Sequence, residues 1–166
     1  MKSLILMAYV AIGSNVMAAD LSVGHSVPDI RATLLDSTEV FQLSQQHDKT
    51  VIVNFWATWC APCKEEMPAL QAYADKHKSE GLTVLAISMD DPRDLPEVRR
   101  IAQQYRFQVA LKSDANFKGL GRIWRMPTTF VIDRDGILRK NGQVGDAAIT
   151  LTELESLVTP LLKKAQ

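Results

Sequence analysis

The stretch of sequence that decides the fold spans residues 51–63 and reads VIVNFWATWCAPC. Its first part, residues 51–56, is β-branched, aromatic and nearly uncharged, which is typical of a strand buried on both faces of a sheet. The chain's only two cysteines, Cys60 and Cys63, follow at the point where we expect a helix to begin. The pattern therefore predicts a buried strand that delivers a cysteine pair to a helix N-terminus.

This position makes a cysteine reactive. A thiol at a helix N-terminus meets unpaired backbone N–H groups and the positive end of the helix dipole, and both favour the thiolate. Because the thiolate is the nucleophile, we predict that Cys60 is the attacking sulfur. Cys63 lies one helical turn further on, where it can form a disulfide with Cys60 and release a molecule that Cys60 has captured. A CxxC pair among alternating strands and helices therefore indicates redox chemistry.

Two other roles are open to a CxxC pair. A closed structural zinc site needs four nitrogen or sulfur ligands, and the remaining candidates, His25, His47 and His77, are scattered along the chain. A purely structural disulfide is disfavoured because so short a loop constrains the unfolded chain very little. The redox interpretation is therefore the strongest of the three, with no metal and no separate cofactor expected.

Length and charge limit the kinds of partner. The 166 residues suffice for one domain with one sizeable core. The 19 basic residues balance the 19 acidic ones, and no basic cluster occurs. Because nucleic-acid binding depends on clustered positive charge, we expect a protein that binds no nucleic acid. We also expect a monomer.

The N-terminus has the pattern of a secretory signal peptide over residues 1–18. Lys2 supplies the positive charge, residues 4–12 the apolar stretch and residues 16–18 the small-residue cleavage pattern. The apolar run is short for a bilayer span, and an uncleaved membrane anchor is the alternative. We therefore expect an exported, periplasmic protein with its domain over residues 24–165. An unprotected dithiol does not stay reduced by itself in such an oxidising space.

The rest of the chain alternates strands and helices. Strands are predicted over residues 30–34, 39–41, 51–56, 82–88, 109–111, 128–132 and 137–140, and helices over residues 61–78, from residue 94 onward, over residues 116–122 and from residue 150 onward. Pro68 is expected to bend the first long helix, and Pro160 to break or kink the last one. The Asp-Gly turn at residues 133–136 makes the final strand pair antiparallel, so the pattern predicts a mixed sheet flanked by helices.

The first long helix places one acidic side chain among apolar ones. At about 100° per residue, Glu66 falls on the same face as Cys63, Met67 and Leu70. Burial there would raise the pKa of the carboxyl, which could then exchange a proton with the nearby thiol. The alternative is a first-turn glutamate that bends out to water, because acidic residues favour helix N-termini.

Other side chains near the cysteines carry weaker signals. The same helical projection places Gln71 on the solvent face and His77 in a packed, structural position. Trp59 precedes the first cysteine and is predicted to be a surface ring against which a partner packs. Pro127 stands before the strand at residues 128–132, where proline is tolerated, and either a trans or a cis bond is open.

Two segments resemble the thioredoxin superfamily, and within it the exported TlpA/ResA-type thiol-disulfide oxidoreductases. Residues 54–68, NFWATWCAPCKEEMP, look like that family's active-site segment, and residues 126–133, MPTTFVID, look like its cis-proline segment. The likeness extends from Gly24 to the end of the last helix. It implies an α/β thioredoxin-like fold with an N-terminal hairpin and an additional strand-helix element between residues 82 and 111.

The resemblance also implies a substrate-binding surface. Pro127 would be cis, and Met126 would lie beside the disulfide, where the backbone of a substrate can pair with it. Together with Trp59, Ala61 and Pro62, these residues form the expected surface for protein substrates.

The resemblance further assigns the proton chemistry. Glu66 matches an acidic position near the family's redox centre. Asn54 occupies the position where thioredoxin has a buried aspartate that assists proton transfer, and an amide cannot take up that proton. Glu66 is therefore the remaining candidate for a buried acid that serves Cys63.

We accordingly expect an exported thiol-disulfide oxidoreductase that reduces protein disulfides. The resemblance suggests apocytochrome c as one substrate and a membrane-embedded thiol protein as the electron donor. The alternatives are a disulfide-forming oxidant of exported proteins and a non-enzymatic metal-binding thiol protein. Peroxiredoxins share the fold but place a lone cysteine differently, and copper-delivery relatives use a wider CxxxC with a downstream histidine.

Overall fold

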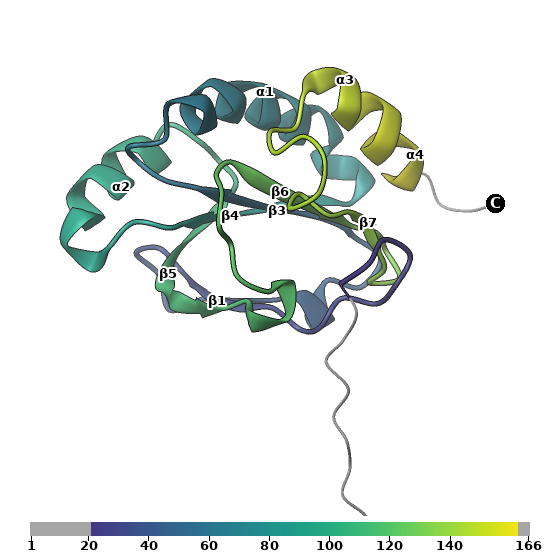
Figure 1. Ribbon diagram of the computed structural model, residues 1–166, viewed down its shortest axis with the longest axis horizontal. Coiled ribbons are helices and arrows are strands. Elements are labelled where there is room, and N and C mark those ends of the chain that lie inside the picture. Colours follow the sequence, from purple (N-terminus) through teal and green to yellow (C-terminus); the bar gives the residue numbers. More distant parts are fainter. Residues whose placement is uncertain (1–20, 163–166) are drawn as a thin grey trace, which may run out of the picture.

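The computed structural model describes residues 21–162, and its centre is a seven-stranded sheet with helices packed against it (Figure 1). The predicted signal segment and the last residues of the predicted domain lie outside the described residues. Within residues 21–162, no helix combines the length and the apolar character needed to cross a bilayer. The elements are β1 (Arg31–Leu34), β2 (Val40–Gln42), β3 (Thr50–Trp56), α1 (Ala61–His77), β4 (Leu82–Ser88), α2 (Leu95–Ala102), β5 (Gln108–Asn116), β6 (Thr128–Ile132), β7 (Leu138–Lys140), α3 (Leu151–Glu153) and α4 (Thr159–Leu162).

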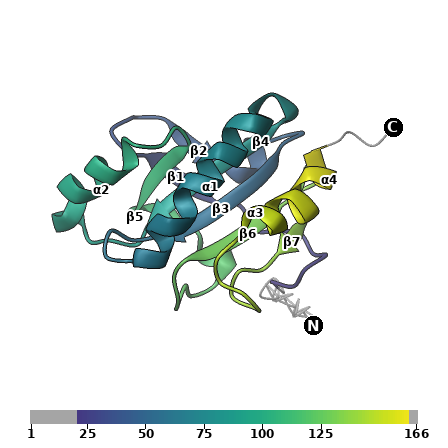
Figure 2. The same cartoon turned by 90° about the horizontal axis from the view of Figure 1, so that it is seen from above.

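The sheet is mixed, as predicted. Its strand order is β2-β1-β5-β4-β3-β6-β7. Strands β3, β4 and β5 run parallel, whereas β1, β2, β6 and β7 pair antiparallel with their neighbours. Figures 1 and 2 both show α1, α3 and α4 on one side of the sheet, over β3, β6 and β7. The central strand β3 therefore lies directly beneath the helix that carries the cysteines.

Strand β3 is buried along its whole length. Successive side chains of a strand point to opposite faces, and two apolar clusters confirm this alternation. Val51, Val53 and Phe55 belong to the cluster on one side of the sheet, whereas Ile52 packs with residues of α1 and α4 on the other. Asn54, fully buried, shares the face of Ile52 and therefore points toward α1.

Two elements, predicted over residues 109–111 and 116–122, differ in length from their predictions. Strand β5 continues to Asn116 instead of ending at Leu111. Its polar second half pairs with β1, where Arg31 lies opposite Asn116, and this pairing does not depend on apolar side chains. The helix expected over residues 116–122 shrinks to a single 3₁₀ turn at Lys118–Leu120.

The last helix shows which of the two outcomes expected at Pro160 does not occur. Thr150 caps its start, because its hydroxyl accepts the N–H of Glu153 at 3.2 Å. The helix is not broken at Pro160 and continues to Leu162. A π-helical turn at Leu154–Val158 precedes the proline. The backbone hydrogen bonds of a π-helical turn span five residues instead of four, and this change accommodates a proline, which has no N–H to donate to the preceding turn.

Helix α1 continues through Pro68 to His77, and one side chain lies where the projection did not place it. Gln71 is buried, not exposed, because its carbonyl accepts the backbone N–H of Arg106 and its amide donates to Asp75 at 2.8 Å. The contact comes from the chain after α2, which a projection of α1 alone does not contain. His77 is packed as predicted, with its ring centroid 4.4 Å from that of Tyr73.

Candidate redox site

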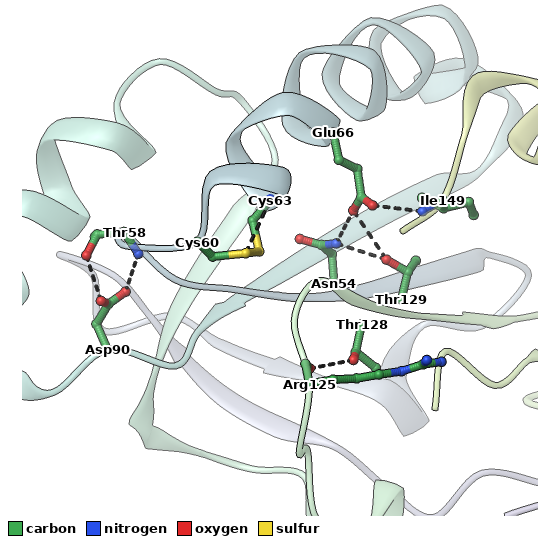
Figure 3. The surroundings of a disulfide bond; sticks show 10 residues. All are labelled: Asn54, Thr58, Cys60, Cys63, Glu66, Asp90, Arg125, Thr128, Thr129 and Ile149. Carbon is green, nitrogen blue, oxygen red and sulfur yellow. Dashed lines mark hydrogen bonds between the residues drawn. A yellow bond between two sulfur atoms is a disulfide. The ribbon is translucent and has the colours of Figure 1, made fainter. Parts of the chain in front are cut away.

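Cys60 and Cys63 form a disulfide at the start of α1 (Figure 3). Cys60 is the N-cap residue, and its sulfur accepts the backbone N–H of Cys63 at 3.3 Å. Pro62 lies in the first helical turn, where its missing N–H leaves no bond unmade. The local sequence thus places the first sulfur at the helix N-terminus and the second inside the helix.

The two sulfurs differ in their access to solvent. The exposed fraction is 5% for Cys60 and 1% for Cys63. Trp59, by contrast, is 68% exposed, and Ala61 and Pro62 are also exposed. A partner that reaches the disulfide therefore meets these three side chains and Cys60 before it meets Cys63.

A buried aspartate that sequence reasoning missed braces the loop before the cysteines. Asp90 accepts the backbone N–H and the hydroxyl of Thr58 at 2.9 and 2.7 Å (Figure 3). It also accepts the hydroxyl of Ser88 at 2.7 Å. Strands β3 and β4 are parallel, so the segments that follow them meet at the same edge of the sheet. An acidic residue two positions after the end of a buried strand was the signal available in the sequence.

The Met126–Pro127 peptide is cis, as the resemblance implied. Pro127 is buried, and Met126 packs against the cluster that contains both cysteines. Arg125 holds this loop by donating to the carbonyls of Gly142 and Gly145 at 2.7 and 2.8 Å. The cis-proline segment thus lies against the redox centre.

A second exposed tryptophan precedes this loop. Trp124 is 64% exposed, and the guanidinium of Arg125 lies 5.1 Å from the centroid of its ring. Sequence reasoning did not single it out, because a tryptophan outside a motif is more often part of a core. Trp124 is exposed and directly precedes the cis-proline segment. It therefore adds a large apolar side chain near the substrate-binding surface that the sequence predicted.

Glu66 is buried, so the alternative in which it bends out to water is wrong. Its exposed fraction is 7%. One carboxylate oxygen accepts the Asn54 amide at 2.6 Å and the Thr129 hydroxyl at 3.4 Å, and the other accepts the backbone N–H of Ile149 at 2.7 Å (Figure 3). Two strands, β3 and β6, and the segment before α3 therefore converge on this carboxyl of α1.

Burial raises the pKa of Glu66 from 4.5 to about 7. The hydrogen bonds from Ile149, Asn54 and Thr129 and the positive charge of Lys140 all favour the carboxylate and oppose this rise. Desolvation is the larger effect, because the carboxyl lies beneath α1 with little access to water. Glu66 can therefore gain or lose a proton near neutral pH, one helical turn from Cys63.

The described residues form no metal site. Residues 21–162 contain no group of three or more histidine, cysteine, aspartate or glutamate side chains that could hold one. His77, one of the scattered candidate ligands, is packed against Tyr73 and bonded to Glu80 at 2.7 Å.

Gly142 lies so close to the backbone of Thr129 that we expect a larger residue there to disturb the contacts of Glu66. A Cβ atom at this position would overlap the backbone N and O atoms of Thr129, whose side chain contacts Glu66. We expect Gly142→Ala to cost about 1–3 kcal/mol in the free energy of unfolding, as overpacking of rigid neighbours does. Denaturant titration measures this cost.

Gly136→Ala shows the opposite case, because a Cβ there meets nothing within 4 Å although φ is +77°. It carries the strain of a left-handed backbone without the overlap. If Gly142→Ala leaves the free energy of unfolding unchanged, the close contact with Thr129 does not constrain the site.

Comparison with known proteins identifies the family. The AhpC/TSA family model matches residues 23–141. Thiol-disulfide oxidoreductase ResA from Oceanobacillus iheyensis is 34% identical over 145 residues, which cover 84% of this chain and 72% of the relative. ResA from Bacillus cereus is 31% identical over 118 residues, which cover 70% of this chain and 66% of the relative. The chain thus spans about two thirds of the length of these relatives.

The same fold occurs in a solved structure. A thiol:disulfide interchange protein of the thioredoxin family from Chlorobium tepidum superposes with a TM-score of 0.69 at 26% identity, over 87% of this chain and 100% of that one. The predicted thioredoxin-like fold is therefore confirmed. The chain belongs to the AhpC/TSA family and, within it, to the ResA-type thiol-disulfide oxidoreductases.

Proposed function

We propose that this protein is an exported reductase of protein disulfides in which Cys60 attacks, Cys63 resolves and Glu66 takes up and returns a proton. The observation that carries the proposal is the burial of the Glu66 carboxyl one helical turn behind a disulfide at a helix N-terminus, which raises its pKa to about 7. An inert disulfide needs no titratable group beside it. A dithiol that exchanges with substrates needs one, because each cycle moves protons as well as electrons.

The proposed cycle begins with the reduced pair. The Cys60 thiolate attacks one sulfur of a substrate disulfide, forms a mixed disulfide and releases the first substrate thiolate. The Cys63 thiol then gives its proton to the Glu66 carboxylate, and the resulting thiolate attacks the Cys60 sulfur. The Cys60–Cys63 disulfide forms, and the second substrate thiolate leaves. The substrate has gained two electrons and, once its thiolates are protonated, two protons.

The assignment of Cys60 as the attacking sulfur is supported by position and access. Cys60 caps the helix, where the thiolate is favoured. It is also the more exposed of the two sulfurs. Cys63, deeper in the helix, can reach only a partner that Cys60 has already bound.

The proposed docking surface for protein substrates combines the exposed turn and the cis-proline segment. It comprises Trp59, Ala61, Pro62, Met126 and Pro127. Large, rigid aromatic side chains contribute most to such contacts, since they bury much area at little entropic cost. Unfolded or extended segments that carry a disulfide, such as an apocytochrome c, are substrates of the appropriate kind.

The electrons are proposed to come from a membrane-embedded thiol protein. The chain has no cysteine besides Cys60 and Cys63, so any electrons must enter through the same pair that reduces the substrate. The signal-peptide pattern of residues 1–18 supports an oxidising compartment, in which a reductase depends on a continuous supply of electrons.

The direction of the reaction is tested by the redox state of the full chain in cells. Acid quenching followed by thiol alkylation and a mobility-shift gel gives the ratio of dithiol to disulfide, with the Cys60→Ser and Cys63→Ser variants as mobility standards. We expect the dithiol to predominate. A protein found almost wholly oxidised, with a reduction potential near about −120 mV, would instead be a disulfide-forming oxidant.

A further inference from the structure

The amide of Asn54 is bonded on one side only. Its nitrogen donates both hydrogens, to Glu66 at 2.6 Å and to Thr129 at 2.9 Å. Its oxygen is buried and accepts no hydrogen bond from any described residue. Figure 3 shows the nitrogen on the side of Glu66 and Thr129 and the oxygen pointing toward the disulfide. A buried carbonyl without a donor is unfavourable and requires an explanation.

The alternation of β3 supports this placement. Ile52, Asn54 and Trp56 share the face beneath α1. Trp56 packs in the cluster that contains both cysteines, whereas Ile52 packs in the cluster that contains Leu70. Asn54 therefore lies beneath the part of α1 between the cysteines and Leu70, where Glu66 also points down.

We propose that Asn54 is a positioning residue for Cys63: its carbonyl accepts the S–H of the Cys63 thiol in the reduced protein, and its amide links that thiol to Glu66. In the disulfide, neither sulfur carries a hydrogen, and the carbonyl has no partner. Reduction breaks the S–S bond and adds two electrons and two protons to the pair, and one of these protons supplies the missing donor. The proposal deepens the proposed function. It depends on that function in one respect, which is that the cysteine pair must cycle between disulfide and dithiol.

The same amide makes Cys63 sensitive to the charge of Glu66. If the Asn54 amide were rotated by half a turn while Glu66 is ionised, the amide oxygen would face a carboxylate oxygen, and the two would repel each other. The ionised carboxylate therefore keeps the Asn54 carbonyl directed toward the cysteines. Once Glu66 is protonated, its O–H can donate to the carbonyl of the rotated Asn54 amide, whose N–H then faces the Cys63 thiolate. Whether the proton is on Cys63 or on Glu66, one orientation of the amide therefore makes a hydrogen bond to both residues.

The other groups that face Glu66 do not supply this link. From β7, Lys140 acts on it by charge, and Lys140 is itself paired with Glu153 of α3 at 2.6 Å. From β6 and the segment before α3, Thr129 and Ile149 donate uncharged hydrogen bonds. On α1 itself, the neighbouring charged residues 64 and 65 are exposed.

The proposal is tested by a double-mutant cycle on the purified full chain. The reduction potential is measured against glutathione between pH 5 and 9 for the wild type, Asn54→Leu, Glu66→Gln and the double variant. Asn54→Leu removes a hydrogen bond that only the dithiol makes. We expect it to favour the disulfide about threefold to tenfold, equivalent to about 15 to 30 mV toward more negative potential for a two-electron couple.

The coupling is read from the pH dependence. Glu66→Gln should change the pH profile of the potential in the wild-type background and change it much less when Asn54 is already replaced. Thr129→Val is the matched control, since it loses a hydrogen bond to the same amide but keeps the carbonyl. An unchanged potential for Asn54→Leu, or a Glu66→Gln effect of equal size in both backgrounds, overturns the proposal.

A second measurement needs no substitution at Asn54 and covers the case in which Asn54→Leu fails to fold. The S–H stretching band of Cys63, observed in the reduced Cys60→Ser variant, should lie below the frequency of a free thiol. A band at the free-thiol frequency contradicts the proposed hydrogen bond. None of these readouts involves a protein substrate, so a failure here leaves the proposed reductase function untouched, and a failure to reduce substrates leaves these readouts interpretable.

Discussion

The oxidised protein is expected to lose about 2–3 kcal/mol of stability between pH 5 and pH 8 through the ionisation of Glu66 alone. The carboxyl has a pKa of 4.5 when exposed and about 7 in the folded protein. A folded-state pKa that is raised means that the folded protein holds the proton more tightly. This contribution to stability is therefore fully present below pH 4.5, declines as the pH rises toward 7, and is lost above it.

The difference between the wild type and Glu66→Gln isolates this effect. Urea unfolding at pH 5 and pH 8 gives the free energy of unfolding of each protein, and the advantage of the wild type should shrink by that amount at the higher pH. Glu65→Gln, one position away on the exposed side of α1, should show no such change. Parallel pH profiles for the wild type and both variants would mean that Glu66 does not titrate in a buried site.

The arrangement of the redox helix could be predicted because it depends on local periodicity. Residues 51–56 read as a buried strand, and the helical projection from Cys63 placed Glu66, Met67 and Leu70 on the buried face. Both patterns are properties of a single element. Gln71 shows the limit, because its burial depends on the backbone of Arg106 across the fold.

The surroundings of Glu66 could not be predicted in this way. Its partners Asn54, Thr129 and Ile149 come from two strands and from the segment before α3, between 12 and 83 residues away in the sequence. Only the register of β3 against β6, which pairs Asn54 with Thr129, brings two of them together. Sequence reasoning recognised that Asn54 cannot carry a proton but not that its amide donates hydrogen bonds to both Glu66 and Thr129.

Replacing either cysteine is expected to have the largest effect, because we propose that Cys60 is the attacking sulfur and Cys63 the resolving one. A mixed disulfide between Cys60 and a substrate is resolved only by attack of the second sulfur. Without that sulfur, the complex has no internal route of release. Reduced Cys63→Ser should therefore accumulate as a covalent complex with a disulfide-bonded protein such as insulin, whereas Cys60→Ser, which keeps only the less accessible sulfur, should not.

The most direct measurement is a non-reducing gel of the two reduced serine variants after incubation with the same disulfide-bonded substrate. The wild type provides the reference, since its own second cysteine resolves the complex. We expect a band of substrate-bound protein for Cys63→Ser that disappears on addition of a reducing agent, and no comparable band for Cys60→Ser. Equal bands for both variants, or a band for Cys60→Ser alone, would contradict the assignment of Cys60 as the attacking sulfur and Cys63 as the resolving one.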